Sequence, residues 1–253
     1  MGDNFNTKLY NLLSKELIIH KAGRDNKDTA HKPLSREEAR YLEGEKPIVK
    51  DFVRNGINIA TLEEISFLGK YKDNKNSIRL ALQWLENTNN KLIINDLLTI
   101  IYANKYLKEN AKKAFEKAIN CWENAIPTSH DILDIAGNII LKTADESSYN
   151  KLLSMIRENK FSSQENDMFN YRWYFVEAIG RMKNQKGAVD ELIKLLDDKR
   201  LYPSAIKALG NQKNPKALPH LKPFLNHKSP DITKYTVSAI AKIEKAQEKK
   251  NNK

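Results

Sequence analysis

The sequence predicts an all-α protein, an α-α superhelix of about five to six helical hairpins preceded by an irregular helical N-terminal cap. Two observations predict this fold. The triplets A-I-G, A-L-G and A-I-A recur at residues 178–180, 208–210 and 239–241. A polar turn and a second apolar segment follow each of the first two triplets, at residues 188–196 and 217–225. Repeats of about 30 residues that alternate two helices are typical of solenoids.

The composition agrees with a helical, water-soluble chain. Of the 253 residues, 40% are apolar and 30% are charged, and there are only 9 Gly and 8 Pro. No apolar run approaches the roughly 20 residues that cross a bilayer. The first residues lack the apolar segment of a secretory signal. The single cysteine, Cys121, excludes an internal disulfide. We therefore expect a cytoplasmic protein without membrane association.

Three segments follow from this pattern. Residues 1–58 form the N-terminal cap, residues 59–246 form the repeats, and residues 247–253 form a basic, disordered tail. Small residues recur at one place of each repeat, at Gly69, Ala103, Gly137, Gly180, Gly210 and Ala241. We expect the two helices of a hairpin to cross closely at these positions, because a bulky side chain would separate them.

The repeats resemble a known family. The pattern A-[IL]-G, a short turn containing N-P-K-A, and then L-x-x-L-x-x-x-L is similar to HEAT repeats, and specifically to the short HEAT-like repeats of phycobilin-lyase type. The resemblance is good over residues 168–246, weaker over residues 61–159 and absent before residue 58. It implies a right-handed α-α superhelix and a role in binding macromolecules. It does not imply lyase activity, because such repeats occur in many unrelated proteins.

One position of the family pattern is only partly kept. Many such repeats carry an arginine about eight residues before the small residue. Arg172 matches this position in its repeat, whereas Ser129, Tyr202 and Thr233 depart from it.

A cluster of aromatic residues, Y-R-W-Y-F at residues 171–175, is the best candidate for a binding site. Five large side chains cannot all face a narrow core, so one or two should be exposed. An exposed aromatic ring beside an arginine anchors a protein or a nucleic-acid base well. The alternative is that Tyr171, Tyr174 and Phe175 belong to the core and that Arg172 packs against a neighbouring loop. The candidate interaction surface comprises Arg172, Trp173, Arg181, Lys183, Lys199 and Arg200.

The positive charge is uneven. Residues 161–253 contain 18 Lys and Arg against 10 Asp and Glu, whereas residues 1–160 contain 25 against 22. A basic face is a common footprint of nucleic-acid binding. The alternative is a solvated lysine-rich surface, which the excess of Lys over Arg favours.

The candidates for catalysis are weak. His130 and Asp134, four residues apart on one helix face, have a spacing that suits a metal ion. The string H-D-x-x-D also fits the beginning of a helix, where acidic residues are favoured. Cys121 has no histidine nearby in the sequence to activate it. No phosphate-binding or zinc-protease motif is present. We therefore predict a non-catalytic protein without cofactor or metal.

Two classes of function remain. The first is an interaction scaffold that binds a protein partner through the solenoid surface. The second is a nucleic-acid-binding solenoid. A narrower variant of it is an enzyme similar to the HEAT-like alkylpurine DNA glycosylases. Those enzymes line a basic groove with aromatic residues and a carboxylate, for which Trp84, Trp122, Trp173 and Asp134 are available. A chromophore-lyase role rests on the repeat resemblance alone.

Overall fold

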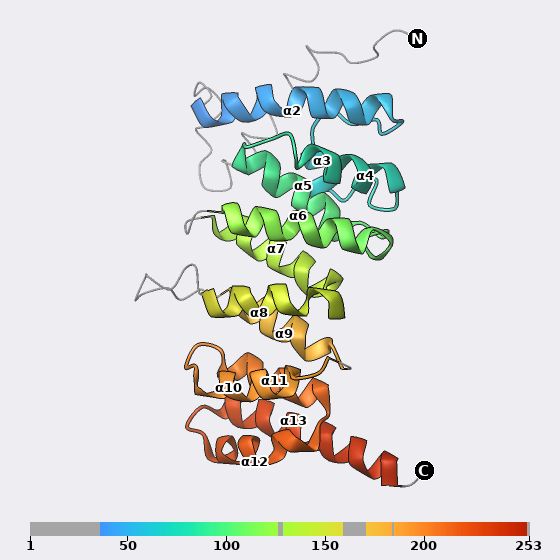
Figure 1. Cartoon of the computed structure of the whole chain (residues 1–253). Coiled ribbons are helices and arrows are strands. Elements are labelled where there is room, and N and C mark those ends of the chain that lie inside the picture. The colour runs from blue at the N-terminus through green and yellow to red at the C-terminus, as the bar shows by residue number, and fades with distance from the viewer. Residues whose placement is uncertain (1–35, 126–128, 159–170, 184, 252–253) are drawn as a thin grey trace. The chain divides into compact units, whose positions relative to one another are not determined.

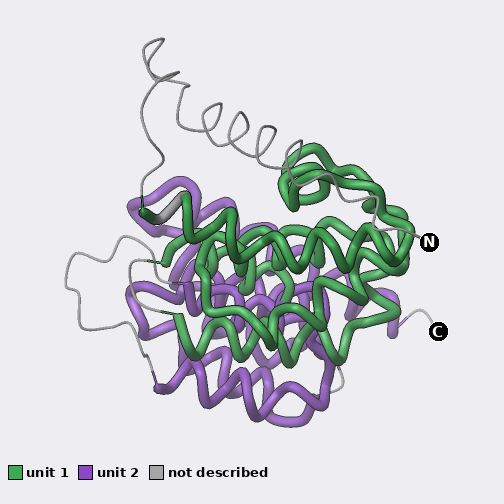
Figure 2. Tube along the Cα trace, turned by 90° about the horizontal axis from the view of Figure 1, so that it is seen from above, with its two compact units in different colours: residues 1–139 green, residues 140–253 purple. Residues whose placement is uncertain are grey.

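The structure is a computed structural model that describes residues 36–125, 129–158, 171–183 and 185–251. The described residues form α-helices, short 3-10 helices and connecting turns, with no strand among them (Figure 1). The chain divides into two compact units, residues 1–139 and 140–253 (Figure 2). In the described part of the chain, no helix combines the length and the apolar character that crossing a membrane requires. The all-helical prediction is confirmed.

The first unit contains a long helix followed by shorter ones. Its helices are α2 (Arg36–Arg54), α3 (Glu63–Ser66), α4 (Lys75–Trp84), α5 (Lys91–Ala103), α6 (Ala111–Asn124) and the larger part of α7 (His130–Thr143), with a 3-10 turn at Lys108–Asn110. Asparagines begin two of them. The Asn74 side chain accepts a hydrogen bond from a backbone N–H of the first turn of α4, and Asn90 accepts two from α5. Such caps satisfy N–H groups that have no partner inside the helix.

The second unit contains the repeats that the sequence shows most clearly. Its α-helices are α8 (Tyr149–Glu158), α9 (Trp173–Arg181), α10 (Ala188–Lys194), α11 (Tyr202–Gln212), α12 (Leu218–Leu221) and α13 (Pro230–Asn251). Short 3-10 helices extend them at Glu146–Ser148, Leu195–Asp197, Pro215–Ala217 and Lys222–Asn226. Helix α11 packs against both α9 and α13. The first helices of three successive repeats are therefore stacked side by side.

Two glycines make this stacking close. A Cβ on Gly180 would lie 2.6 Å from the Cβ of Ala208 and 2.7 Å from its Cα. A Cβ on Gly210 would lie 2.7 Å from the Cα of Ala239. The glycine of one triplet thus contacts the first alanine of the next triplet. The sequence correctly predicts a close helix contact here, but the partner is the corresponding helix of the next repeat rather than the second helix of the same hairpin.

Two of the predicted small residues in the first unit, Gly69 and Ala103, do not make the predicted contact, whereas the position of Gly137 stays a prediction. Gly69 has a φ of +68° and no atom within 4 Å of its would-be Cβ. It is a turn glycine after α3, where only a residue without a side chain adopts this conformation freely. Ala103 ends α5 and is exposed. Neither residue supports a close helix contact of the kind made by Gly180 and Gly210.

Gln212 fastens α11 to the preceding repeat. Its buried side-chain amide donates to the carbonyl oxygens of Ile179 at 2.8 Å and Met182 at 3.0 Å. These carbonyls lie in the last turn of α9 and at the residue that follows it, where backbone acceptors have few partners inside the helix. The carbonyl of Ile179 also accepts from the backbone N–H of Met182. Helix α11 therefore supplies both a close packing contact and a helix cap to α9.

The end of the chain differs from the prediction. Helix α13 continues to Asn251 and includes residues 247–251, which the sequence assigns to a disordered tail. The segment consists of Gln, Glu, Lys and Asn, and the first three have high helix propensity. Lysines near a helix C-terminus also interact favourably with the helix dipole. The boundary at residue 58 between cap and repeats stays a prediction.

The packing role of Gly210 is testable against the matching position of the last repeat. Gly210→Val should lower the free energy of unfolding by at least about 2 kcal/mol, because the added side chain overlaps the backbone of Ala239. Ala241 occupies the same place in the last repeat and is exposed, so Ala241→Val should change stability by less than about 1 kcal/mol. Urea unfolding followed by circular dichroism measures both, and equal effects would contradict the proposed contact.

Candidate interaction surface

Arg172 holds two segments of the second unit together. It lies immediately before α9, and one Nη donates to the carbonyl oxygen of Ile156 at 3.1 Å. The other Nη donates to Asp198 at 3.1 Å, in the turn before α11. The side chain of Arg172 is only 12% exposed. It therefore packs structurally against a neighbouring loop, which is the alternative that the sequence left open.

Tyr202 occupies the corresponding place of the next repeat. Its hydroxyl lies 3.4 Å from Nε2 of His227, in the turn before α13, and its ring stacks on Phe224. The backbone N–H of Ser229 donates to the other ring nitrogen of His227. Arg172 and Tyr202 thus contact the next loop by different chemistry. The sequence pattern treats Tyr202 as a departure, yet it serves the same purpose.

Basic side chains project from these two loops. Lys199 and Arg200 follow Asp198 in the first loop, and Lys228 follows His227 in the second. All three are exposed, and within the described residues none of them forms an ion pair. The backbone N–H of Arg200 donates to Asp198, which fixes the turn. We call Lys199, Arg200 and Lys228 the loop edge.

The other two predicted cations lie at the opposite end of α9. Arg181 and Lys183 are nine or more residues beyond Arg172, which is about 14 Å at 1.5 Å per residue. Both are exposed. An Nη of Arg181 donates to the carbonyl oxygen of Leu141 at 3.1 Å and so caps the end of α7. The structure therefore divides the predicted surface into two groups instead of one continuous rim.

The aromatic cluster belongs mainly to the core. Tyr171, Tyr174 and Phe175 are buried. Trp173 is half-buried and stacks on Tyr174, with ring centroids 3.7 Å apart. Trp173 is therefore the ring of this cluster that is best placed to contribute to binding.

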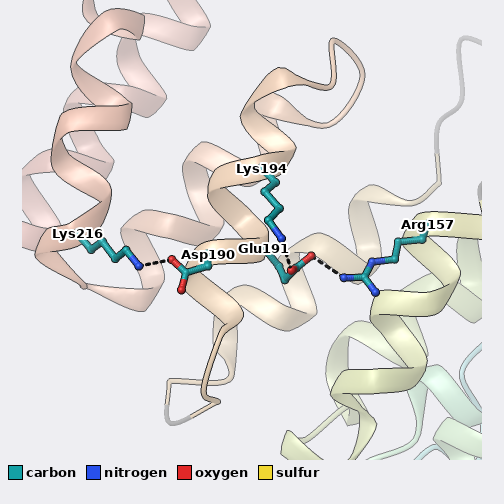
Figure 3. A network of polar contacts seen from close by, with 5 residues as sticks. All are labelled: Arg157, Asp190, Glu191, Lys194 and Lys216. Carbon is teal, nitrogen blue, oxygen red and sulfur yellow. Dashed lines mark hydrogen bonds and ion pairs between the residues drawn. The ribbon is translucent and has the colours of Figure 1, made fainter.

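The second helices of the repeats carry a network of opposite charges (Figure 3). Glu191 of α10 accepts from Arg157 of α8 at 2.9 Å and from Lys194 at 2.8 Å. Asp190 pairs with Lys216 of the next repeat at 2.5 Å. Hydrogen bonds first from Lys194 and then from Arg157 lower the pKa of Glu191. Arg157, Lys194 and Lys216 are thus each matched by a carboxylate.

The candidates for catalysis lie in the first unit. His130 is the first residue of α7, and Asp134 accepts a hydrogen bond from Asn138 one turn later. The described residues contain no group of three or more His, Cys, Asp or Glu that could hold a metal ion. Burial raises the pKa of the Cys121 thiol to about 11. The protonated thiol that prevails at neutral pH is a poor nucleophile.

The family comparison bears on the second unit. Residues 163–241 match the family model of HEAT repeats. This part of the chain is a HEAT-repeat region. The match covers both close glycine contacts and the loop edge, and HEAT repeats are typically scaffolds for protein–protein interaction. No curated protein and no solved structure matches the chain.

The structural role of Arg172 predicts a loss of stability on truncation. Arg172→Ala should lower the free energy of unfolding by about 1.5–3 kcal/mol, because it removes charge-assisted hydrogen bonds from a largely buried position. Arg200→Ala is the control and should stay within about 0.5 kcal/mol. Chemical denaturation of both variants measures the difference, and a neutral Arg172→Ala would contradict the role described.

The lowered pKa of Glu191 predicts a pH-dependent contribution to stability. Its ion pairs contribute fully above the ordinary carboxyl pKa of 4.5. The contribution disappears as pH falls through the lower folded-state pKa, because protonation removes the charge. Glu191→Gln should thus be less stable than the wild type by at most about 1 kcal/mol at pH 7. The two unfolding curves should converge under acid, and a gap that widens at low pH would contradict this.

Proposed function

We propose that the protein is a non-catalytic interaction scaffold that binds a protein partner through its HEAT-repeat region. The observation that supports this most is the loop edge. Three exposed cations stand on turns that Arg172 and Tyr202 hold to the stacked first helices. A rigid base reduces the entropy lost when side chains become ordered on binding. Trp173, before the first of these turns in the chain, adds an aromatic surface of the kind enriched at interfaces.

The chemistry of this edge favours an acidic protein surface as the partner. Lys and Arg on a rim steer an acidic partner and fix its orientation. Nucleic acid is a weaker candidate, because phosphate binding needs a continuous series of cations. In the second unit Lys194 and Lys216 pair with carboxylates, and Arg181 lies at the other end of α9. The basic residues of 161–253 therefore do not form a continuous cationic surface.

The glycosylase variant loses one of its aromatic candidates. Trp122 is buried, at 3% exposure, and cannot present its ring to a base. The indole N–H of Trp84 donates to Asp51 at 2.9 Å. A base-binding pocket needs exposed rings on which a base can stack. The resemblance to phycobilin-lyase-type repeats concerns the subtype of the repeat, and we do not propose lyase activity from it. We place the scaffold in the cytoplasm, where Cys121 would stay reduced.

The scaffold proposal is tested by charge reversal at the loop edge. Lys199→Glu/Arg200→Glu should abolish the capture of protein partners from a lysate of the source organism, because it places carboxylates against an acidic partner. Lys249→Glu/Lys250→Glu changes the same charge at the far end of α13 and should leave capture intact. Quantitative mass spectrometry of the captured proteins measures this.

Nucleic-acid binding is measured on the same variants. Labelled single- and double-stranded DNA and RNA should bind weakly, without a steep loss between about 50 and about 200 mM salt. A steep loss that depends on Arg200 would overturn the proposal in favour of nucleic acid. Equal protein capture by both charge-reversed variants would also overturn it.

A further inference from the structure

A separate feature lies in the first unit, along one face of α2. Arg36, Arg40, Gly44 and Ile48 are spaced four residues apart and therefore form one stripe of this helix. A cavity of about 860 Å³ lies between this stripe and the turn that joins α4 to α5. This volume is within the usual range for ligand sites. The described lining consists of Arg36, Arg40, Gly44, Pro47, Ile48, Trp84, Asn87, Thr88, Asn89, Asn90 and Lys91.

Gly44 brings the two walls together. A Cβ at this position would lie 2.7 Å from Cδ1 of Ile93 and 3.9 Å from Nδ2 of Asn90. The first turn of α5 thus approaches the backbone of α2 in the middle of the cavity. The cavity is built by packed helices, since α2 contacts both α4 and α5.

One end of the cavity is apolar. Trp84 is half-buried, and its indole N–H donates to Asp51, one turn beyond Pro47 and Ile48 on α2. This bond holds the tryptophan against the C-terminal part of α2. Pro47 is exposed, so this residue and the indole ring offer a surface for an aliphatic or aromatic side chain.

The other end is cationic. Arg36 and Arg40 lie one helical turn apart, Lys91 begins α5, and all three are exposed. None of the three forms an ion pair with another described residue, and the described lining contains no carboxylate. The start of α5 is already capped, because Asn90 Oδ1 accepts from the backbone N–H groups of Leu92 and Ile93. The positive charge offered to a ligand therefore comes from side chains.

We infer that this cavity, which we call the α2–α5 groove, binds a short acidic peptide segment of a partner protein. Its carboxylates pair with Arg36, Arg40 and Lys91, since guanidinium groups bind carboxylates through two parallel hydrogen bonds. An apolar residue of the same segment packs on Trp84 and Pro47. The inference does not depend on the loop edge, which belongs to the other unit.

The groove fits a peptide better than a nucleic acid. Asn87, Thr88 and Asn89 line it with both donors and acceptors, which match the alternating N–H and C=O groups of a peptide. The described lining holds three cations, whereas a phosphate backbone needs cations along its whole track. The apolar end of the groove favours the binding of an apolar peptide side chain and does not favour the binding of a phosphate.

The test is fluorescence anisotropy of the full-length protein with a fluorescein-labelled peptide in which glutamates flank a single leucine. The wild type should bind this peptide, and replacing its glutamates by glutamines should weaken binding by about tenfold or more. Arg36→Gln/Arg40→Gln should cause a similar loss. Lys249→Gln/Lys250→Gln, with the same change in net charge, should bind within about twofold of the wild type. Circular dichroism verifies that each variant is folded.

A second variant tests the apolar end. Ile48 is fully buried, so the change is made in the peptide, where leucine is replaced by serine. This should weaken binding to the wild type by about three- to tenfold. The inference is overturned if the arginine variant binds as the wild type does, or if the glutamine peptide binds equally well. It is also overturned if single-stranded DNA or inorganic phosphate competes at lower concentration than the unlabelled peptide.

Discussion

The close contact between a glycine and an alanine of successive first helices is the constraint on which the second unit depends. Gly180 against Ala208 and Gly210 against Ala239 leave no room for even one methyl group. Because the helix backbones approach so closely, α11 also comes within reach of the end of α9, where Gln212 binds two carbonyl oxygens. The same approach places each first helix beside the loop of the next hairpin. The loop edge is a consequence of the packing.

The two repeats show that one structural task accepts different side chains. Arg172 reaches Asp198 through a charged hydrogen bond, and Tyr202 reaches His227 and Phe224 through ring contacts. Both fasten a loop to the helix before it. A guanidinium group can bind an aspartate, and a phenol can contact an imidazole. A sequence pattern that requires arginine therefore detects the first kind of contact and misses the second.

The repeat is easiest to recognise in the sequence where the helix packing is most regular. Gly180 and Gly210 were identified because their environment repeats, whereas Gly69 shares only their residue type and has a left-handed backbone that the sequence does not reveal. The aromatic and basic residue types that predict the surface do not show that Arg172 is nearly buried, so the sequence leaves its structural role as an alternative. The α2–α5 groove was missed, although the spacing of Arg36, Arg40, Gly44 and Ile48 suggests it, because its second wall comes from residues about 40 positions later.

Within the described residues, α13 packs against one first helix, α11, whereas α11 packs against two. Val237 lies four residues before Ala241 and is 53% exposed, while Val176 and Ile206, four residues before Gly180 and Gly210, are fully buried. In an array whose stability is a sum over adjacent pairs, an end element lacks one of the two terms. Local opening should therefore cost least at α13, and its backbone amides should exchange with solvent deuterium sooner than those of α9 and α11. The rigidity of the array should thus decrease from α9 and α11 to α13.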